Sequence, residues 1–441
     1  MSEEHNGQKL SQKLADFAVN FTLNSAPAKA MDNAKLAILD CLGVAVLATA
    51  QEIGVNLLKF AEANASPGPC TIWGSNRSVS VRDAAFINGT LAHGLDYDDR
   101  NHSTTYTLAT SMSFAELTDL SGAKMLEAFI VGREVRNNLD ALFGRRGDGI
   151  GPGAKGWHSN GILGPIAAAC SASHALRLST QQTLAAIGLA AGSCGALTRD
   201  GGTMAKPFRC GHAAATGATC ALLAQSGFSS DDTAIEGRFG LLEALGPIPG
   251  EIIGDLARDL GRKFHLENEN RIKPYASCTA THNGLEAMLR LVRAHNIQPE
   301  AVEAIECDQK PYPLVRQIPQ RGYEGRFSMA YCLSMALVHR ELRPGDFIDA
   351  NVQQPIVQEL MSRVRHTPGG PALVIQLKDG SQLEEKLQTP SDLHGWDAVA
   401  DKFRASTQGI ITPSKTDTII DHIKKLESLA SIRTLTAALR T

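Results

Sequence analysis

The sequence has no block of like charge and no apolar run long enough to cross a membrane. Its formal net charge is −3 over 441 residues, so neither nucleic acid nor a membrane surface is an expected partner. The longest uninterrupted apolar run is LGVAVLATA, far short of the roughly 20 residues that span a bilayer. The start, MSEEHNGQKLSQ, is polar and acidic, unlike a signal peptide or an arginine-rich transit peptide. We therefore expect a soluble, cytoplasmic protein.

Paired cysteines are also missing from the sequence. The nine cysteines are scattered and none forms a CxxC pair, which in a chain of this size indicates reduced thiols rather than a disulfide framework. Four of them lie among Ala, Leu and Gly and are predicted to be small buried hydrophobic side chains: Cys170, Cys194, Cys220 and Cys332.

The alternation typical of strands is nearly absent from the first 265 residues, where only CTIW at 70–73 shows it. Apolar residues instead recur at a spacing of three to four, which predicts helices. The clearest such segments are 31–50, 125–143, 161–178 and 181–197. Because they are rich in Ala and Gly, their backbones can approach one another closely. We predict a large, tightly packed, all-helical domain over 1–265.

The pattern changes after this point. Segments 301–308 and 371–388 predict strands, and the second contains the turn signal Asp379-Gly380. Helical spacing returns between and after these strands, at 281–295, 327–341, 397–406 and 419–429. We predict a smaller α+β domain over 266–392 and C-terminal helices over 393–441 that pack back on the first domain. The predicted fold class is mainly α.

The stretch FINGTLAHGLDYDDRNH, residues 86–102, places three carboxylates where an apolar helix ends. If residues 82–97 are helical, Asn88, Ala92 and Asp96 share one face of the helix. Acids are disfavoured at a helix C-terminus by the macrodipole, and an unfavourable local choice of this kind is typical of a functional site. His102 follows in the predicted loop and is a second candidate.

The same stretch contains ligand types for a metal, but their spacing matches no metal motif that we recognise. We expect no metal and no cofactor. A second cluster, GRRGDGIGPGAKGWHSNG at 144–161, contains a glycine-rich run without the preceding strand that a dinucleotide site requires. A loop that delivers His158 to the start of the next helix is more economical, because a helix N-terminus favours the neutral imidazole.

Three further clusters combine cations with polar groups at the start of predicted helices. They are TRDGGTMAKPFRCGHAA with Lys206 and Arg209, RIKPYASCTATHNG with Lys273, Tyr275 and His282, and EGRFSMAYCLS with Arg326, Ser328 and Tyr331. Cations at such positions are well placed to bind an anion. Together with the carboxylates and histidines they favour proton transfer next to a bound carboxylate, in which the cations stabilise an enediolate-like state.

Five motifs resemble the MmgE/PrpD family: INGTLAHGLDYDD, His158 in GWHSNG, TMAKPFRCGHAAATG, IKPYASCTATH and GRFSMAYCLS. They occur in the family's order and cover nearly the whole chain. The family includes 2-methylcitrate dehydratase, cis-aconitate decarboxylase and iminodisuccinate epimerase. The resemblance implies a helical domain with an α+β lid, an active site between them and a homodimer. It also implies a small di- or tricarboxylate substrate and no metal or organic cofactor.

By position, the family's active-site aspartate falls on Asp96, its histidine on His158, its lysines on Lys206 and Lys273, and its tyrosine on Tyr331. We expect the two lysines and Arg326 to bind substrate carboxylates, unless burial makes one lysine a base. The base is otherwise predicted among three residues that orient one another: Asp96, His102 and His158. Tyr106 and Tyr331 are predicted to donate hydrogen bonds or protons.

One departure from the family pattern bears on the reaction. After the DYDD motif, dehydratase-like and decarboxylase-like members typically read close to HPATHPS, but this chain reads HSTTYTL, with Tyr106 at the second histidine. Tyrosine is a poor proton relay near pH 7, whereas epimerisation needs only proton removal and return. We therefore predict epimerisation of an iminodisuccinate-like substrate. The alternatives are a dehydratase using Tyr106 or His102 as the acid, a decarboxylase, and an inactive polycarboxylate-binding protein.

Overall fold

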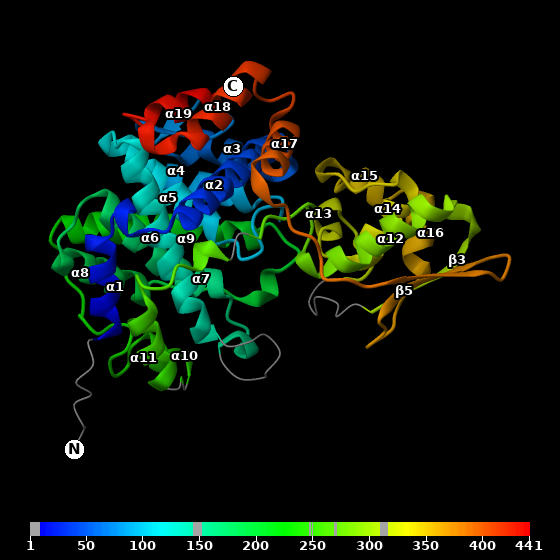
Figure 1. The fold of residues 1–441 in the computed structure, drawn as a ribbon, viewed down its shortest axis with the longest axis horizontal. Coiled ribbons are helices and arrows are strands. Elements are labelled where there is room, and N and C mark those ends of the chain that lie inside the picture. The colour runs from blue at the N-terminus through cyan, green and yellow to red at the C-terminus, as the bar shows by residue number, and fades with distance from the viewer. Residues whose placement is uncertain (1–8, 144–151, 247, 249, 269–270, 309–315) are drawn as a thin grey trace.

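The computed structural model describes residues 9–143, 152–246, 248, 250–268, 271–308 and 316–441. The chain forms a large helical body and a smaller lobe that contains the main sheet, as Figure 1 shows. The fold is mainly α, as predicted. Buried apolar residues form two clusters. One runs from Leu10 to Ile272 and resumes at Val399, and the other runs from Ala276 to Ile375. The domain boundaries at 265 and 392 stay a prediction.

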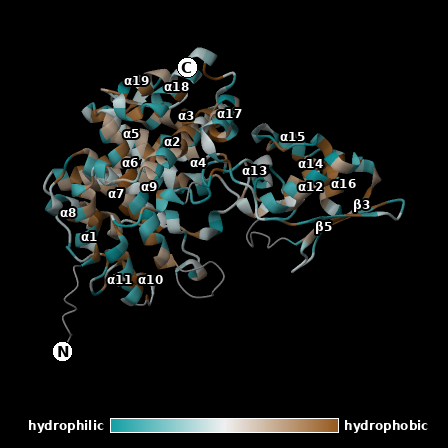
Figure 2. Ribbon diagram, in the orientation of Figure 1, coloured by the Kyte–Doolittle hydropathy of each residue, from teal (hydrophilic) through white to brown (hydrophobic). Residues whose placement is uncertain are grey.

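The helical body is built from the first part of the chain and from the C-terminal tail, which packs back on it. Its main elements are α1 (Leu10–Asn20), α2 (Ala28–Thr49), α3 (Glu52–Asn64), β1 (Cys70–Thr71), β2 (Ser78–Val79), α4 (Val81–His93), α5 (Ser103–Thr118), α6 (Gly122–Leu139), α7 (Ser159–Ala175), α8 (Thr180–Gly192), α9 (Ala205–Gln225), α10 (Leu241–Leu245), α11 (Gly250–Asp259), α17 (Gly395–Thr407), α18 (Pro413–Lys424) and α19 (Arg433–Ala438). Apolar residues gather toward the middle of this body and polar residues toward its rim (Figure 2).

Glycines let the central helices approach one another closely. A Cβ atom at Gly211 on α9 would lie 2.0 Å from Thr90 Oγ1 and 2.2 Å from the Phe86 carbonyl oxygen on α4. On the other side of α9, a Cβ at Gly217 would lie 2.6 Å from the backbone nitrogen of Ala169 on α7. Helix α9 is thereby held between α4 and α7, and its first turn is fixed in place beside the end of α4.

The lid lobe contains a four-stranded sheet with helices packed against it (Figure 1). Its elements are α12 (His282–His295), β3 (Val302–Cys307), α13 (Gly322–Gly325), α14 (Met329–His339), α15 (Asp349–Val352), α16 (Pro355–Arg363), β4 (Val364–His366), β5 (Ala372–Leu377) and β6 (Gln382–Lys386). The strand order is β4-β3-β5-β6, with β3 parallel to β4 and antiparallel to β5. Gly380 adopts φ 87° in the predicted hairpin turn between β5 and β6.

One prediction needs correction at this level, and one strand was missed. Cys194 is only partly buried, because it lies two residues past the end of α8 at Gly192, although it still packs against the core. Strand β4 was not predicted, since three residues are too few for a periodic signal. The other three cysteines predicted to be buried, Cys170, Cys220 and Cys332, are buried.

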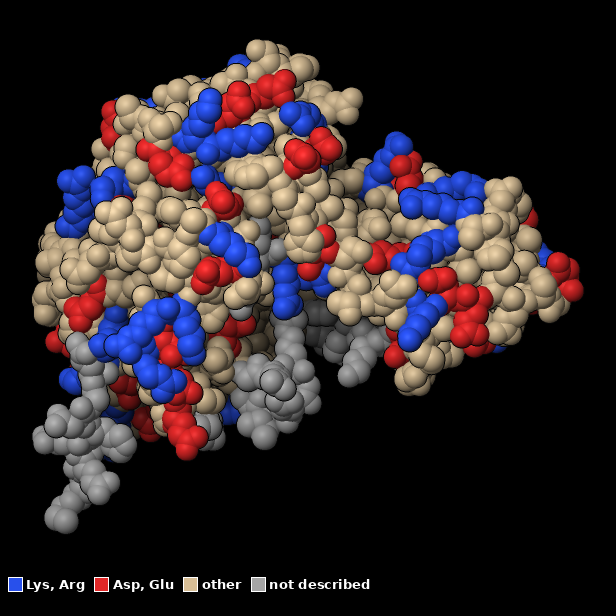
Figure 3. All heavy atoms as spheres, viewed as in Figure 1, with Lys and Arg blue, Asp and Glu red and all other residues tan. Residues whose placement is uncertain are grey.

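Charges of both signs alternate over the face drawn in Figure 3. In the part of the chain that the structure describes, no single helix is long and apolar enough to cross a membrane. Helices α2 and α3 combine enough length and apolar character only as a pair, and the pair bends by 79° at its break.

The close contact at Gly211 generates a stability prediction. Adding a methyl group there places it against α4 backbone, so we expect Gly211→Ala to lower the free energy of unfolding by about 1–3 kcal/mol. The matched control is Gly192→Ala at the end of α8, where an added Cβ meets nothing within 4 Å. It should be neutral or slightly stabilising. Urea unfolding of both variants measures the difference, and equal stabilities would contradict this account of the α4–α9 contact.

Candidate active site

The site is built around the loop that follows α4, and this loop differs from the prediction. Helix α4 ends at His93, four residues before the predicted end at 97, and Asp96 adopts a left-handed backbone with φ 50°. Asp is one of the few residues that tolerates this conformation. The predicted shared face of Asn88, Ala92 and Asp96 is therefore wrong. Asn88 instead accepts a hydrogen bond from the Trp73 amide at 3.0 Å, while Asp96 turns toward two lysines.

Asp96 lies between two buried ammonium groups. Lys206 Nζ, in the first turn of α9, is 2.8 Å from Asp96 Oδ2, and Lys273 Nζ is 2.5 Å from Asp96 Oδ1. Burial alone would raise the pKa of Asp96, but the two lysines outweigh it and hold this pKa well below its usual range. The carboxylate therefore stays ionised. Its role as a base, one of the predicted options, is disfavoured because both of its oxygens are engaged by lysine ammonium groups.

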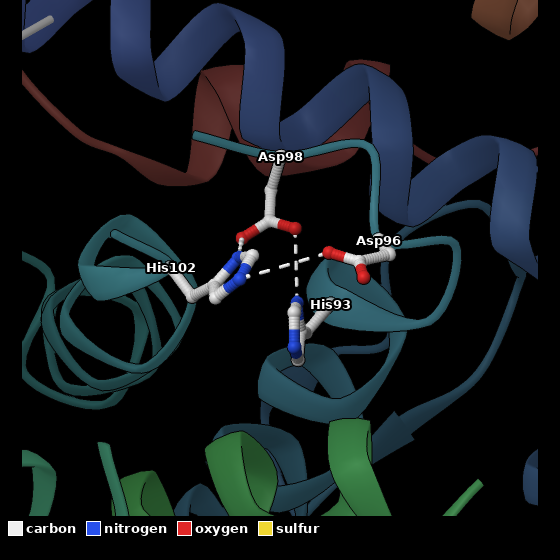
Figure 4. A group of neighbouring side chains, drawn as sticks. All are labelled: His93, Asp96, Asp98 and His102. Carbon is white, nitrogen blue, oxygen red and sulfur yellow. Dashed lines mark hydrogen bonds and ion pairs between the residues drawn. The ribbon is translucent and has the colours of Figure 1, made fainter. Parts of the chain in front are cut away.

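Asp98 holds two histidines at once, as Figure 4 shows. His93 Nδ1 lies 2.9 Å from Asp98 Oδ1, and His102 Nδ1 lies 2.9 Å from Asp98 Oδ2. The two imidazole centroids are 4.0 Å apart. Burial would raise the pKa of Asp98, but the two histidines keep it below the usual value. An ionised carboxylate can only accept hydrogen bonds, so both Nδ1 atoms carry the proton in this arrangement.

The tautomers of the two histidines follow from this contact. Burial lowers the pKa of both His93 and His102, which keeps the rings neutral near pH 7. A neutral imidazole protonated at Nδ1 has its lone pair on Nε2. His102 Nε2 is 3.6 Å from Asp96 Oδ1, the oxygen that Lys273 also contacts. The His102 side chain is 12% exposed and that of His93 only 1%, which makes His102 the accessible base of the two.

These four side chains also form a compact group of metal-ligand types. One ligand atom from each of His93, Asp96, Asp98 and His102 lies within 4.8 Å of the others. The charges around them do not suit a divalent cation, however. Both Asp96 oxygens face ammonium groups, and both Nδ1 atoms face Asp98. A metal ion would have to replace these contacts beside two positive charges.

The third carboxylate of the motif has a structural role. Asp99 Oδ2 accepts from Arg133 Nη1 at 3.0 Å and from the Thr104 backbone amide at 3.1 Å. Its Oδ1 accepts from the Asn101 amide at 2.9 Å. Asp99 thus fixes the start of α5, which carries His102 as its N-cap residue at φ 60°.

Tyr106 and His158 are connected through one asparagine. The Tyr106 hydroxyl donates to Asn160 Oδ1 at 3.4 Å, and the Asn160 backbone amide donates to His158 Nδ1 at 3.3 Å. His158 is the N-cap residue of α7, as predicted. Burial raises the pKa of the Tyr106 phenol. Both residues thus contact Asn160, and their chemical roles stay predictions.

Tyr331 and Arg326 lie on the lid and contact backbone carbonyls. The Tyr331 hydroxyl donates to the Asp346 carbonyl at 2.5 Å. Arg326 Nη1 donates to the carbonyls of Leu95 at 3.1 Å and Ala276 at 2.8 Å. Arg326 thereby ties the lid to the residue just before Asp96. Its predicted contact with a substrate carboxylate is not tested by this geometry.

The sequence analysis missed Lys402 on α17 of the C-terminal tail. Its Nζ is 2.6 Å from Asp40 Oδ1 and donates to the carbonyls of Tyr97 at 2.6 Å and Lys273 at 2.9 Å. Burial raises the pKa of Asp40 to about 6, against the attraction of Lys402. Lys402 thus joins the two segments that carry Asp96 and Lys273. A single lysine in an ordinary amphipathic helix offers no local signal for this role.

Comparison with known proteins agrees with the motifs. The family profile described as MmgE/PrpD N-terminal domain matches residues 12–249, and the MmgE/PrpD C-terminal domain matches residues 275–428. Relatives are described as cis-aconitate decarboxylase. The one from Mus musculus is 27% identical, and the match covers 92% of this chain and 88% of the relative. The one from Homo sapiens is 25% identical, and the match covers 93% of this chain and 90% of the relative. The one from Aspergillus terreus is 23% identical, and the match covers 97% of this chain and 95% of the relative.

The contact of Asp98 with both histidines predicts a spectroscopic result. At pH 7, nitrogen-15 NMR should show His93 and His102 as neutral rings protonated at Nδ1. Asn at position 98 can accept at its oxygen but must donate at its nitrogen. Asp98→Asn should therefore move at least one ring to the Nε2-protonated tautomer. Finding both rings unchanged in the variant would show that Asp98 does not set the tautomers.

A second prediction concerns pH and stability. Burial and the charge of Lys273 lower the pKa of His282 to about 3, and its Nε2 is 3.1 Å from the Ser277 carbonyl oxygen. Below pH 6.5 the unfolded chain binds a proton that the folded chain excludes, so this histidine makes stability fall as pH drops toward 3. His282→Gln should reduce the slope of the unfolding free energy against pH, below pH 6.5, by up to about 1.4 kcal/mol per pH unit.

Urea unfolding between pH 5 and 7.5 measures the slope. His295→Gln, at an exposed histidine at the end of the same helix, is the matched control. Equal slopes in the wild type and His282→Gln would contradict the exclusion of the proton.

Proposed function

The chain belongs to the MmgE/PrpD family, and from this premise we propose that it removes a proton from carbon next to a carboxylate of a small polycarboxylate. The observation that carries the proposal is the neutral His102 held beside the Asp96–Lys206–Lys273 triad. A base and a cluster of cations are the two components that α-proton abstraction requires. No cofactor enters this scheme.

The two lysines differ in how many of their N–H donors are available to a substrate. An ammonium group has three N–H donors. Lys273 Nζ has three acceptors, which are Asp96 Oδ1 at 2.5 Å, the Asp96 carbonyl at 2.8 Å and the Ser277 carbonyl at 3.4 Å. Lys206 Nζ has one described acceptor, Asp96 Oδ2, and lies 5.1 Å from the centroid of the Phe327 ring. Lys206 is therefore the lysine that binds a substrate carboxylate, and Lys273 anchors Asp96.

The chemical step then assigns one task to each group. His102 Nε2 accepts the α-proton, and Asp98 stabilises the imidazolium that forms. Lys206 stabilises the negative charge that develops on the substrate carboxylate. A proton from solvent is then delivered to the opposite face of the α-carbon, and His102 releases the abstracted proton to solvent, which completes an epimerisation.

We propose epimerisation of an iminodisuccinate-like substrate as the reaction. It is supported by Tyr106, which replaces the second histidine of the dehydratase-like and decarboxylase-like motif. Its phenol has a raised pKa and donates to Asn160, so it is a poor acid for a departing hydroxyl. Decarboxylation is the second candidate, because relatives matched over nearly the whole chain carry the name cis-aconitate decarboxylase.

Proton NMR in D₂O tests the proposal with iminodisuccinates, 2-methylcitrate, citrate and cis-aconitate as the panel. We expect α-deuteration with inversion of configuration. His102→Gln should slow the exchange by about 10²–10⁴-fold. Lys206→Met should raise KM more than the control variant Lys415→Met, which changes a lysine on α18. Loss of CO₂ would select the decarboxylase, and a new olefin signal without loss of CO₂ would select the dehydratase. Silence across the panel would favour the inactive binding protein.

A further inference from the structure

Tyr323 is a lid residue that reaches the helical body. It lies on the short helix α13, whose first backbone amide, that of Gly322, donates to Asp349 Oδ1 at 2.8 Å. Its ring nevertheless packs against the apolar cluster of the helical body. Three residues later, Arg326 ties the same segment to the Leu95 carbonyl at 3.1 Å. Tyr323 is thus held at the junction of the two lobes, next to the loop that carries Asp96.

The hydroxyl of Tyr323 is buried and has no hydrogen-bond partner among the described residues. The two tyrosines predicted from sequence differ in this respect. Tyr106 donates to Asn160, and Tyr331 donates to the Asp346 carbonyl. Buried polar groups in native proteins are nearly always paired. An unpaired buried hydroxyl beside a site therefore points to a partner that arrives with a ligand.

The surroundings of this hydroxyl identify the kind of partner. Burial raises the pKa of Tyr323 and outweighs the nearby Arg326, whose charge lowers it, and the charges of Asp96 and Asp98 add to the increase. The phenol therefore stays protonated and can donate. Its ring centroid is 6.3 Å from that of Phe327, and Lys206 Nζ lies 5.1 Å from the same Phe327 centroid. Tyr323 and the lysine assigned to substrate binding therefore flank one side chain.

A pocket of about 90 Å³ reaches Tyr323 from the junction of the lobes. It is lined by Glu52 of α3, by Leu95 in the loop after α4 and by lid residues that include Arg326. Tyr323 lines this pocket, while its hydroxyl oxygen is buried. Tyr323 can therefore present its hydroxyl to the site as a hydrogen-bond donor that is shielded from solvent.

We propose that the Tyr323 hydroxyl donates a hydrogen bond to a carboxylate of the substrate. Tyr323 and Lys206 either share one carboxylate or bind two different ones. This makes Tyr323 a specificity-determining residue for substrates with more than one carboxylate. The inference rests on the proposed function for the identity of the ligand. It places a residue of the lid lobe in direct contact with substrate.

The test is Tyr323→Phe, which removes only the hydroxyl. We expect KM to rise by about 10–100-fold, the range for losing a hydrogen bond to a charged group, with kcat changed by less than about threefold. Stability without ligand should not fall, because the deleted oxygen has no partner. Tyr331→Phe is the matched control for stability. It loses the bond to the Asp346 carbonyl and should unfold at lower urea concentration.

Binding measurements separate this inference from the proposed function. Calorimetry with citrate, cis-aconitate and acetate should show weaker binding of the first two to Tyr323→Phe, and little change for the monocarboxylate. If the wild type turns over nothing but binds citrate more tightly than the variant, the proposed reaction fails and the contact stands. Equal KM and equal binding in both proteins, or a stability loss matching that of Tyr331→Phe, would overturn the contact. Failure of the wild type to bind any of the three would overturn it as well.

Discussion

The arrangement of the site depends on one buried carboxylate that satisfies two buried lysines. Removing ions from water costs several kcal/mol each unless they are paired, so Asp96 and its lysines can only be buried together. Lys206 comes from the helical body and Lys273 from the segment that leads into the lid. Lys402, from the tail, donates to the carbonyl of Tyr97, next to Asp96, and to the carbonyl of Lys273 itself. Pairing of charge therefore forces three distant parts of the chain to meet at the loop after α4.

The same requirement explains why three aspartates stand so close together. Asp96 pairs with lysines, Asp98 with histidines and Asp99 with Arg133. Each has its own positive or hydrogen-bonding partner, which limits their mutual repulsion. Two of the residues in this loop, Asp96 and His102, adopt left-handed backbones. Such conformations cost about 1–3 kcal/mol each and persist where surrounding contacts fix them. The loop is thus held in a strained form by the contacts that arrange the proposed base.

The regular parts of this fold follow from local pattern, and the site geometry does not. Spacing of apolar residues predicted α2, α6, α7, α12 and the β5–β6 hairpin close to their observed positions. The end of α4 was placed four residues late, because periodicity does not register a backbone reversal at Asp96. The contacts of Lys402 and the orphan hydroxyl of Tyr323 depend on packing between distant segments. No local signal marks them, whereas Asp96, Lys206 and Lys273 were recognisable from family motifs.

The two lysines also bear on the state of the base. A positive charge near an imidazole disfavours its protonation, and both lysines, after burial and His93, lower the pKa of His102. The charge that stabilises a developing enediolate therefore also keeps the base unprotonated near neutral pH. After the proton has moved, the imidazolium gains Asp98 as its counter-ion at 2.9 Å. One set of fixed charges can thus favour the neutral His102 ring before proton transfer and stabilise its imidazolium afterwards, without movement of the protein.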